Sequence, residues 1–384
     1  MCIFTIGDKL MNKIIKSILL SALALPMASV SAFESASQER SMHIAEQKRA
    51  LALSFAKNYT ALKPSILAST SRYDLIVEPA ELVLNNQAIS NLKQVEANIR
   101  KAKGLPKNSH SITQLRVADS SMLNSLMSET PLFAWAPAGN EKSWQFIEAF
   151  DTQGNTFHLP VNELPKRPVL IVELDNKQAL SEGISVLKKT LKPFSSSPKQ
   201  AFESSIQSSI NPIQTSVLKS IHLQDDEEPW ISGKAEVYSI VTGVSPSRDE
   251  PVLDIVDMPY LDYDGTTYHP NQIIIYWDRY RWQAADILMM EQDDNTNYKE
   301  LASRLLDVAT EILKAIPDPE VQGYAIIPQL TNKVLAAMPD SWFTNDDDYV
   351  DVYYTLFEGQ RYSNHKGASS NATITLEPLT IQPR

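Results

Sequence analysis

Apolar residues recur at helical spacing in two stretches near the start of the chain, residues 35–60 and 91–104. From residue 131 the pattern changes to short extended pieces, which read "PLFAW", "WQFIEAF", "NTFHLPV" and "PVLIVEL". Turn residues over 151–155 predict a hairpin between the second and third pieces, and helical spacing returns over 177–191. We therefore predict a small α+β domain over residues 33–191.

Residues 192–228 have a different composition. The stretch is rich in serine ("FSSSP", "ESSIQSSINP"), contains Pro193, Pro198 and Pro212, and ends in the acidic run 225–228. Serine and proline at this density are typical of loops and connecting segments. We predict a linker here, with room for one short helix.

Polar and apolar residues alternate along most of the chain from residue 229 onward. Six pieces have the period of a strand: "AEVYSIVTGV", "PVLDIVDM", "NQIIIYW", "RWQAADILMM", "DYVDVYYTL" and "NATITLEP". Two helical stretches, 298–316 and about 321–338, interrupt the series before the fifth strand. The pattern predicts an antiparallel β-sandwich over 229–384 with an inserted helical pair at about 298–338, and an α+β fold class for the whole chain.

The first residues have the three parts of an export signal. Read from Met11, the stretch "MNKIIKSILLSALALPMASVSA" begins with Lys13 and Lys16, continues with an apolar run, and ends in small residues before Phe33. We therefore predict a signal peptide over 1–32, with the start at Met11, and export to the periplasm or the medium. No later stretch is long and apolar enough to span a membrane.

Cysteine usage and net charge restrict the chemistry further. Cys2 is the only cysteine and precedes the predicted start, so the mature chain would have no disulfide, thiolate metal site or cysteine nucleophile. The formal net charge is −11. Such a balance repels nucleic acid and attracts cations.

Local catalytic motifs are missing from the sequence. The closest two glycines, Gly359 and Gly367, are too far apart for a dinucleotide-binding fingerprint, a Walker loop or a nucleophile elbow. The six histidines never have the spacing of a zinc-protease helix. Whether the protein is an enzyme stays open. One alternative is an exported hydrolase with its site in the N-terminal domain or the interdomain cleft, which a serine or carboxylate bonded to His110 or His158 would support.

The stretch "EQDDNTNYKE" over 291–300 suggests either a calcium loop or the start of a helix. It fails the helix-loop-helix calcium pattern, because Tyr298 replaces the required glycine and Arg304 the bidentate glutamate. Asn297 with Glu300 three residues later is typical of a helix N-terminus.

The expected strand topology supports a calcium site more strongly than the local motif does. If the strands alternate in direction, the loops after the second and fourth strands and the start of the fifth strand lie at one rim. This rim carries Asp257, Asp262, Asp264, Glu291, Asp293, Asp294, Asp346, Asp347 and Asp348. So many carboxylates repel one another unless a cation lies between them, and hard oxygen ligands in loops suit Ca²⁺.

These observations lead to our hypothesis of a non-catalytic, calcium-binding interaction module with an unknown protein or glycan partner. A purely structural protein without metal is a further alternative, in which the acids serve only as helix caps and solubilising groups.

Asp286 lies in the middle of the fourth predicted strand. A buried carboxylate there needs a partner, and Arg281 and Lys299 are candidates.

The acidic loops at one end of a sandwich resemble those of C2-type domains, over about 229–384. The resemblance implies calcium rather than membrane docking, because no lysine-rich strand is present and the helical pair departs from an ordinary C2 domain.

The stretches "PLFAWAPAGNEKSWQFIEAFDTQGN", "VDMPYLDYDGTTYHPNQIIIYWD" and "MPDSWFTNDDDYVDVYYTL" are similar to a family of exported bacterial proteins, domain of unknown function 3103. This second resemblance implies export and the domain layout, and it assigns no catalytic or ligand residue.

Overall fold

The computed structural model describes residues 27–71, 75–108, 110–139, 141–194, 212–224, 229–233, 236–246, 250–262, 265–292, 296–315, 323–336, 338 and 349–382. Residues 1–26 of the predicted signal peptide and much of the predicted linker lie outside these ranges. Across the described residues, no helix combines the length and the apolar character needed to cross a membrane.

A six-stranded sheet forms the centre of the N-terminal half. Its strand order is β1-β2-β6-β3-β4-β5, and every neighbouring pair is antiparallel except β3 with β6. The strands are β1 (Ile76–Val77), β2 (Thr113–Val117), β3 (Leu132–Ala134), β4 (Phe146–Phe150), β5 (Thr156–Pro160) and β6 (Val169–Leu174). The predicted hairpin turn joins β4 to β5, and the Asp151 carboxylate accepts hydrogen bonds from the backbone N–H groups of Gln153 and Asn155.

The N-terminal half also contains four α-helices: α2 (Met27–Ser69), α3 (Asn86–Ala102), α4 (Leu123–Ser128) and α5 (Asn176–Thr190). Side-chain caps fix two of their starts, because Asn85 accepts from the N–H of Ala88 before α3, and Asp175 accepts from the N–H of Gln178 before α5. Helix α2 packs against α3 and against strands β3, β4 and β6. It begins within the last residues of the predicted signal peptide.

The C-terminal half is an antiparallel β-sandwich of two sheets. The four-stranded sheet has the order β13-β12-β8-β9, and the five-stranded sheet has the order β10-β7-β15-β14 with β11 also paired to β7. The strands are β7 (Ile213–Leu223), β8 (Val237–Val244), β9 (Pro251–Asp257), β10 (Thr267–Tyr268), β11 (Gln272–Tyr276), β12 (Ala284–Glu291), β13 (Tyr349–Phe357), β14 (Tyr362–Lys366) and β15 (Ala372–Ile381). Apolar side chains of both sheets, such as Leu218, Ile287 and Ile374, meet in one buried core.

Strand β7 corrects the predicted linker, which is wrong over residues 212–224. This eleven-residue strand is central in the five-stranded sheet and pairs with β15 along its whole length. It buries Leu218, Ile221 and Leu223 against the four-stranded sheet. The β-forming residues of the segment outweigh the serines and Pro212 that precede and interrupt them.

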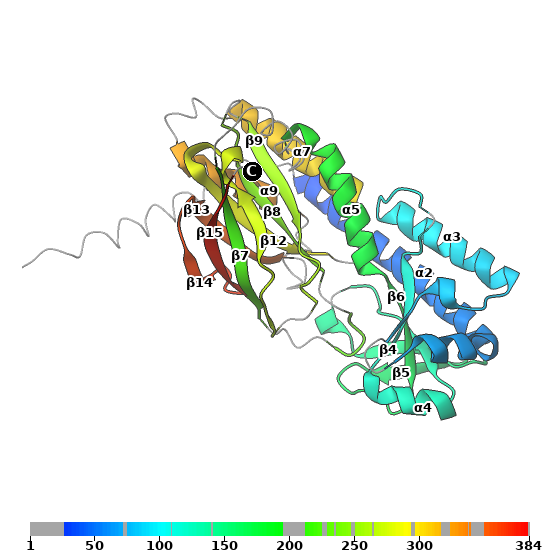
Figure 1. Cartoon of the computed structure of the whole chain (residues 1–384). Helices are drawn as coiled ribbons and strands as arrows, with labels where there is room; N and C mark the ends of the chain where they lie inside the picture. Colours follow the sequence, from blue (N-terminus) through cyan, green and yellow to red (C-terminus); the bar gives the residue numbers. More distant parts are fainter. Residues whose placement is uncertain are drawn as a thin grey trace, which may run out of the picture.

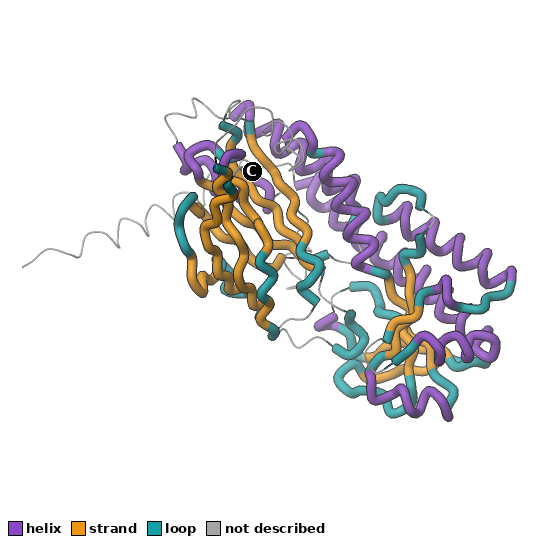
Figure 2. The backbone as a smooth tube through the Cα atoms, in the orientation of Figure 1, coloured by secondary structure: helices purple, strands orange, loops and turns teal. Residues whose placement is uncertain are grey.

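The inserted helices α7 (Tyr298–Ala315) and α9 (Ile326–Ala336) form a helical layer with α5 on the second face of the four-stranded sheet. Figure 1 shows α5 and α7 lying side by side along the sandwich. One hydrophobic cluster runs from α2 through α5 into α7, α9 and this sheet. This cluster therefore joins the N-terminal half to the outer face of the four-stranded sheet, while the core between the two sheets is a separate cluster. Figure 2 shows helices alongside both groups of strands.

The α+β fold class with a β-sandwich and an inserted helical pair is confirmed. All six predicted sandwich strands and both inserted helices are present within a few residues of their expected positions. Short 3-10 helices complete the description: η1 (Pro79–Glu81), η2 (Ser120–Met122), η3 (Glu141–Ser143), η4 (Lys192–Phe194), η5 (Trp277–Arg279), η6 (Arg281–Gln283) and η7 (Gly323–Ala325).

Candidate functional site

The strand register places the ends of β9 and β12 and the start of β13 at one end of the four-stranded sheet. Asp257 of β9 pairs with Tyr238 of β8, which pairs with Met290 of β12, which in turn pairs with Tyr349 of β13. These four residues form one row across the sheet. The chain therefore leaves β9 and β12, and enters β13, at the same end. We call this end the acidic rim, after the nine predicted ligands of the sequence analysis.

Two of the predicted ligands lie close to lysines of α5. The Asp262 carboxylate forms an ion pair with Lys177, with 2.6 Å between Oδ1 and Nζ. Burial raises the pKa of Asp257, and this effect is opposed by the positive charge of Lys188 and by the backbone N–H of Met258. Because ammonium groups repel a metal cation, these two carboxylates are poor candidates for Ca²⁺ ligands.

The remaining predicted ligands are less completely placed. Glu291 is half-buried at the end of β12, while Asp264, Asp293, Asp294, Asp346, Asp347 and Asp348 lie outside the described residues. Among the residues that the structure does describe, no group of three or more His, Cys, Asp or Glu side chains is arranged to hold a metal ion. The calcium site stays a prediction.

The second half of "EQDDNTNYKE" is the start of helix α7 and a contact with the N-terminal half. The Asn297 side chain accepts a hydrogen bond from the backbone N–H of Glu300 at 3.1 Å, as expected for a helix cap. Its Nδ2 donates to the Ala102 carbonyl at 2.8 Å, and the Tyr298 N–H donates to the Lys103 carbonyl at 3.0 Å. The start of α7 is thus hydrogen-bonded to the end of α3.

Tyr298 extends this contact to α5. Its buried ring packs directly on Gly183, where a Cβ would overlap ring atoms. Its hydroxyl bonds to Gln292, whose Nε2 donates to Asn176 at the start of α5. The acidic rim is therefore attached to both α3 and α5 by the residues on either side of 293–295.

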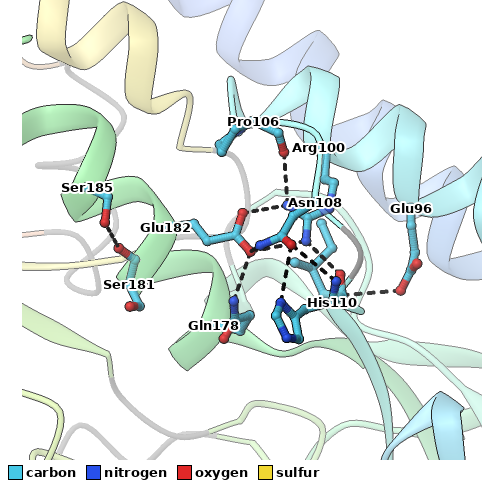
Figure 3. Close-up of polar contacts among 10 residues, drawn as sticks. Glu96, Arg100, Pro106, Asn108, His110, Gln178, Ser181, Glu182 and Ser185 are labelled. Atoms are coloured by element: carbon cyan, nitrogen blue, oxygen red, sulfur yellow. Dashed lines mark hydrogen bonds and ion pairs between the residues drawn. The ribbon is translucent and has the colours of Figure 1, made fainter. Parts of the chain in front are cut away.

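A buried polar cluster lies next to this junction, between α3 and α5 (Figure 3). The Arg100 guanidinium donates two hydrogen bonds to Glu182, at 2.5 and 3.1 Å. Asn108 and Gln178 each donate to the same carboxylate at 2.9 Å. Arg100 also donates to the carbonyl groups of Pro106 and His110, so the cluster holds the loop between α3 and β2 against α5.

The partners of Glu182 in this cluster favour its charged form. Burial alone would raise the pKa of Glu182, but hydrogen bonds from Arg100, Gln178 and Asn108 outweigh it and lower the pKa. Sequence reasoning missed this pair, because Arg100 and Glu182 are 82 positions apart and belong to different elements. The only available signal was that each lies on the apolar side of an amphipathic helix.

The two histidines of the hydrolase hypothesis are both exposed. His110 Nδ1 lies 3.2 Å from Oδ1 of Asn108, whose Nδ2 donates to Glu182, so its partner there is an amide rather than a serine or a carboxylate. Ser111, the next residue, donates to Glu96 instead. The described contacts of His110 therefore provide no nucleophile–base pair. The second histidine, His158, lies on strand β5.

Comparison with known proteins adds a family and no activity. No curated protein and no solved structure matches the chain significantly. A family model described as "Protein of unknown function (DUF3103)" matches residues 48–384, which include all strands and helices described above except the first part of α2. The chain therefore belongs to this family.

Proposed function

We propose that this chain is an exported, non-catalytic binding protein whose C2-like sandwich takes up Ca²⁺ at the acidic rim, and that the metal orders loops which face a protein or glycan partner. The observation that carries the proposal is the single row formed by Asp257, Tyr238, Met290 and Tyr349. This row supports the convergence of three acidic segments. Carboxylates in loops are the ligands that Ca²⁺ prefers.

The contacts of the rim narrow the set of ligands. Asp262 is paired with Lys177, and Asp257 lies in the field of Lys188. We therefore assign the metal to Glu291 and to the acids at 293, 294 and 346–348, and we assign Asp257 and Asp262 to the contact with α5. Two sets of acids at the same rim then have different roles, which substitution can separate.

Thermal unfolding of the full-length mature chain tests the proposal. Extracellular calcium sites bind at about 0.1–1 mM, so ~10 mM Ca²⁺ adds roughly 1.4–2.7 kcal/mol over chelator. For a chain of this length we expect the unfolding temperature to rise by roughly 2–4 °C. Magnesium at the same concentration gives a smaller rise, because it retains its hydration shell in flexible loops.

Two double variants identify the ligands. Asp293→Asn with Asp347→Asn removes two proposed ligands and abolishes most of the calcium-dependent rise. Asp257→Asn with Asp262→Asn is the matched control, and it leaves the rise unchanged. An unchanged rise in the first variant contradicts the assignment, and no response of the wild-type chain to calcium favours the structural protein without metal.

Export is tested separately. The precursor is expressed with its own N-terminus in a Gram-negative host, and the protein is recovered from the periplasm and the medium. We expect the recovered chain to begin at Phe33, directly after the small residues of the predicted signal peptide. Recovery of the intact precursor from the cytoplasm alone contradicts export.

A further inference from the structure

Asp286 is a fully buried carboxyl group in the middle of β12, under helix α9. Its Oδ2 accepts from the Thr331 hydroxyl of α9 at 2.7 Å, and its Oδ1 accepts from the backbone N–H of Thr355 at 2.7 Å. The Thr242 hydroxyl of β8 lies 2.6 Å from that of Thr331. One carboxyl group thus connects a helix with three neighbouring strands.

The backbone around Thr355 depends on this carboxyl group. The pairing of β12 with β13 shifts between Ala285 and Ile287, and Thr355 has a φ of 57°, a left-handed conformation that is rare for a β-branched residue. The shift removes the Thr355 N–H from the regular strand ladder, and Asp286 accepts it instead. The carboxyl group therefore satisfies a donor that the irregular strand leaves over.

No cation bonds to Asp286 among the described contacts, so Arg281 and Lys299 are not its hydrogen-bonding partners. The two groups that donate to Asp286, the Thr331 hydroxyl and the Thr355 N–H, are neutral. The ionisable side chains on the packed elements have other places. Tyr354 of β13 donates to Asn332, and Lys333, the one charged residue of α9, is half-exposed. Tyr238 of β8 lies four rows away, paired with Met290.

The hydrogen-bond network has an arrangement for each protonation state. When Asp286 is ionised, the Thr331 hydroxyl donates to it and the Thr242 hydroxyl donates to Thr331. When Asp286 is protonated, its O–H donates to the Thr331 oxygen, and the Thr331 hydroxyl turns to the carbonyl of Ile327 at 3.2 Å. The protonated arrangement leaves no donor or acceptor unpaired and contains no buried charge.

We propose that Asp286 is a proton-operated joint, which holds helix α9 firmly on the four-stranded sheet when it is protonated and allows α9 to loosen when it ionises. The proposal is independent of the calcium hypothesis, because the joint lies within the core and uses none of the rim acids.

The direction of the effect follows from the two environments of the carboxyl group. Burial raises the pKa of Asp286 to about 6, against the opposing effect of the hydrogen bonds from Thr355 and Thr331. When α9 opens, the carboxyl group returns to water and to its ordinary, lower pKa. Protonation therefore favours the closed joint, and this stabilisation is lost as the pH rises through about 6. Linkage then predicts that α9 opens on the order of tenfold more often at pH 7 than at pH 5.

Hydrogen exchange of the full-length chain, read by mass spectrometry and corrected for the chemical exchange rate at each pH, tests the joint. We expect the opening of α9 to increase about tenfold between pH 5 and pH 7. We expect no such change in α3, which is remote from the joint. A pH-independent α9 contradicts the proposal, and so does an equal change in α3, because that result indicates global unfolding.

Two variants attribute the effect to this carboxyl group. Asp286→Asn accepts from Thr355 and donates to Thr331 without titrating, so its α9 exchange becomes independent of pH. Thr331→Val removes the hydroxyl donor and increases α9 opening, more at pH 7 than at pH 5. Its matched control is Thr310→Val in α7, whose hydroxyl bonds only to the Leu306 carbonyl among the described contacts.

A wild-type slope that persists in Asp286→Asn contradicts the proposal. If that variant does not fold, Thr331→Val still decides, because an α9 profile equal to that of Thr310→Val rules the joint out.

Discussion

Glu182 and Asp286 are both buried carboxyl groups that connect a helix to its surroundings, one in the N-terminal half and one in the sandwich. Glu182 is bonded to the Arg100 guanidinium and to two side-chain amides. Asp286 is bonded to one hydroxyl and one backbone N–H. The described contacts give the first site a cation and four donated hydrogen bonds, and the second two donors and no bonded cation.

Because of this difference in partners, the pKa values of the two groups shift in opposite directions. Burial acts on both groups in the same sense, but the hydrogen bonds from Arg100 and the amides lower the pKa of Glu182, whereas Asp286 is raised to about 6. Glu182 therefore stabilises the fold above its ordinary pKa, and this contribution is lost as the pH falls. Asp286 stabilises the fold at low pH, and its contribution is lost as the pH rises through about 6. The hydrogen-bonding partners of a buried carboxyl group therefore decide whether it stays charged or titrates near neutral pH.

The largest expected effect comes from removing the cation in the first site. Arg100→Met keeps the volume of the side chain but leaves Glu182 buried without its counter-charge, so we expect the free energy of unfolding to fall by about 3–5 kcal/mol at pH 7. Urea unfolding measures it. Arg361→Met is the control, because its pair with Glu377 is exposed and should contribute under about 1 kcal/mol. Equal losses in the two variants contradict the contrast.

The second effect has the opposite sign. Asp286→Asn retains both hydrogen bonds and removes the cost of the buried charge, so we expect the chain to gain up to about 3 kcal/mol at pH 7, corresponding to roughly two pKa units. The gain shrinks as the pH falls below about 6 and disappears near the ordinary pKa of aspartate. Unfolding curves at several pH values measure it, and a gain of the same size at every pH indicates packing rather than titration.

Asp351→Asn sharpens that result. Asp351 is also fully buried in the four-stranded sheet, but it accepts hydrogen bonds from the backbone N–H groups of Val352, Ser369 and Ala372. An amide in its place loses acceptor capacity and turns a donor toward other donors. We expect a loss of about 1–3 kcal/mol at pH 7, where Asp286→Asn gives a gain. A gain in both variants would show that the identity of the donors does not matter.

The contact between the two halves gives a smaller effect. Gly183→Ala places a methyl group where the Tyr298 ring packs, so we expect α5 and α7 to separate slightly and the free energy of unfolding to fall by about 1–3 kcal/mol. Gly233→Ala is the matched control, because nothing lies within 4 Å of the added Cβ. A loss in Gly183→Ala no larger than in the control means that the ring moves aside freely.

Periodicity predicted the elements whose apolar residues face a core. The six sandwich strands and the helical pair were predicted because their alternation or helical spacing is regular, and the cap at Asn297 was predicted from its spacing to Glu300. Strand β14 was missed because it is mostly exposed and polar, and β7 because serine and proline surround it. Local composition predicts such strands poorly, because they form by pairing with distant strands and that pairing cannot be read from the sequence.

The partners of the buried carboxyl groups could not be predicted for a different reason. Asp286 was expected to pair with a nearby cation, but Thr331 and Thr355 are 45 and 69 positions away and reach it only through the packing of α9 and the irregular pairing of β13. At the rim, the alternation of strand direction predicted that the strand ends lie together, but the lysines of α5 come from the other half of the chain. Contacts between distant elements depend on the fold as a whole.

The direct measurement of the proposed function is a calcium titration of the metal-free, full-length mature chain by calorimetry. We expect saturable binding at roughly 0.1–1 mM. We expect loss of that binding in the variant with Asp293 and Asp347 replaced by Asn, and retention in the variant with Asp257 and Asp262 replaced by Asn. Absence of saturable heat in the wild-type chain, or equal binding by both variants, would contradict calcium binding at the acidic rim.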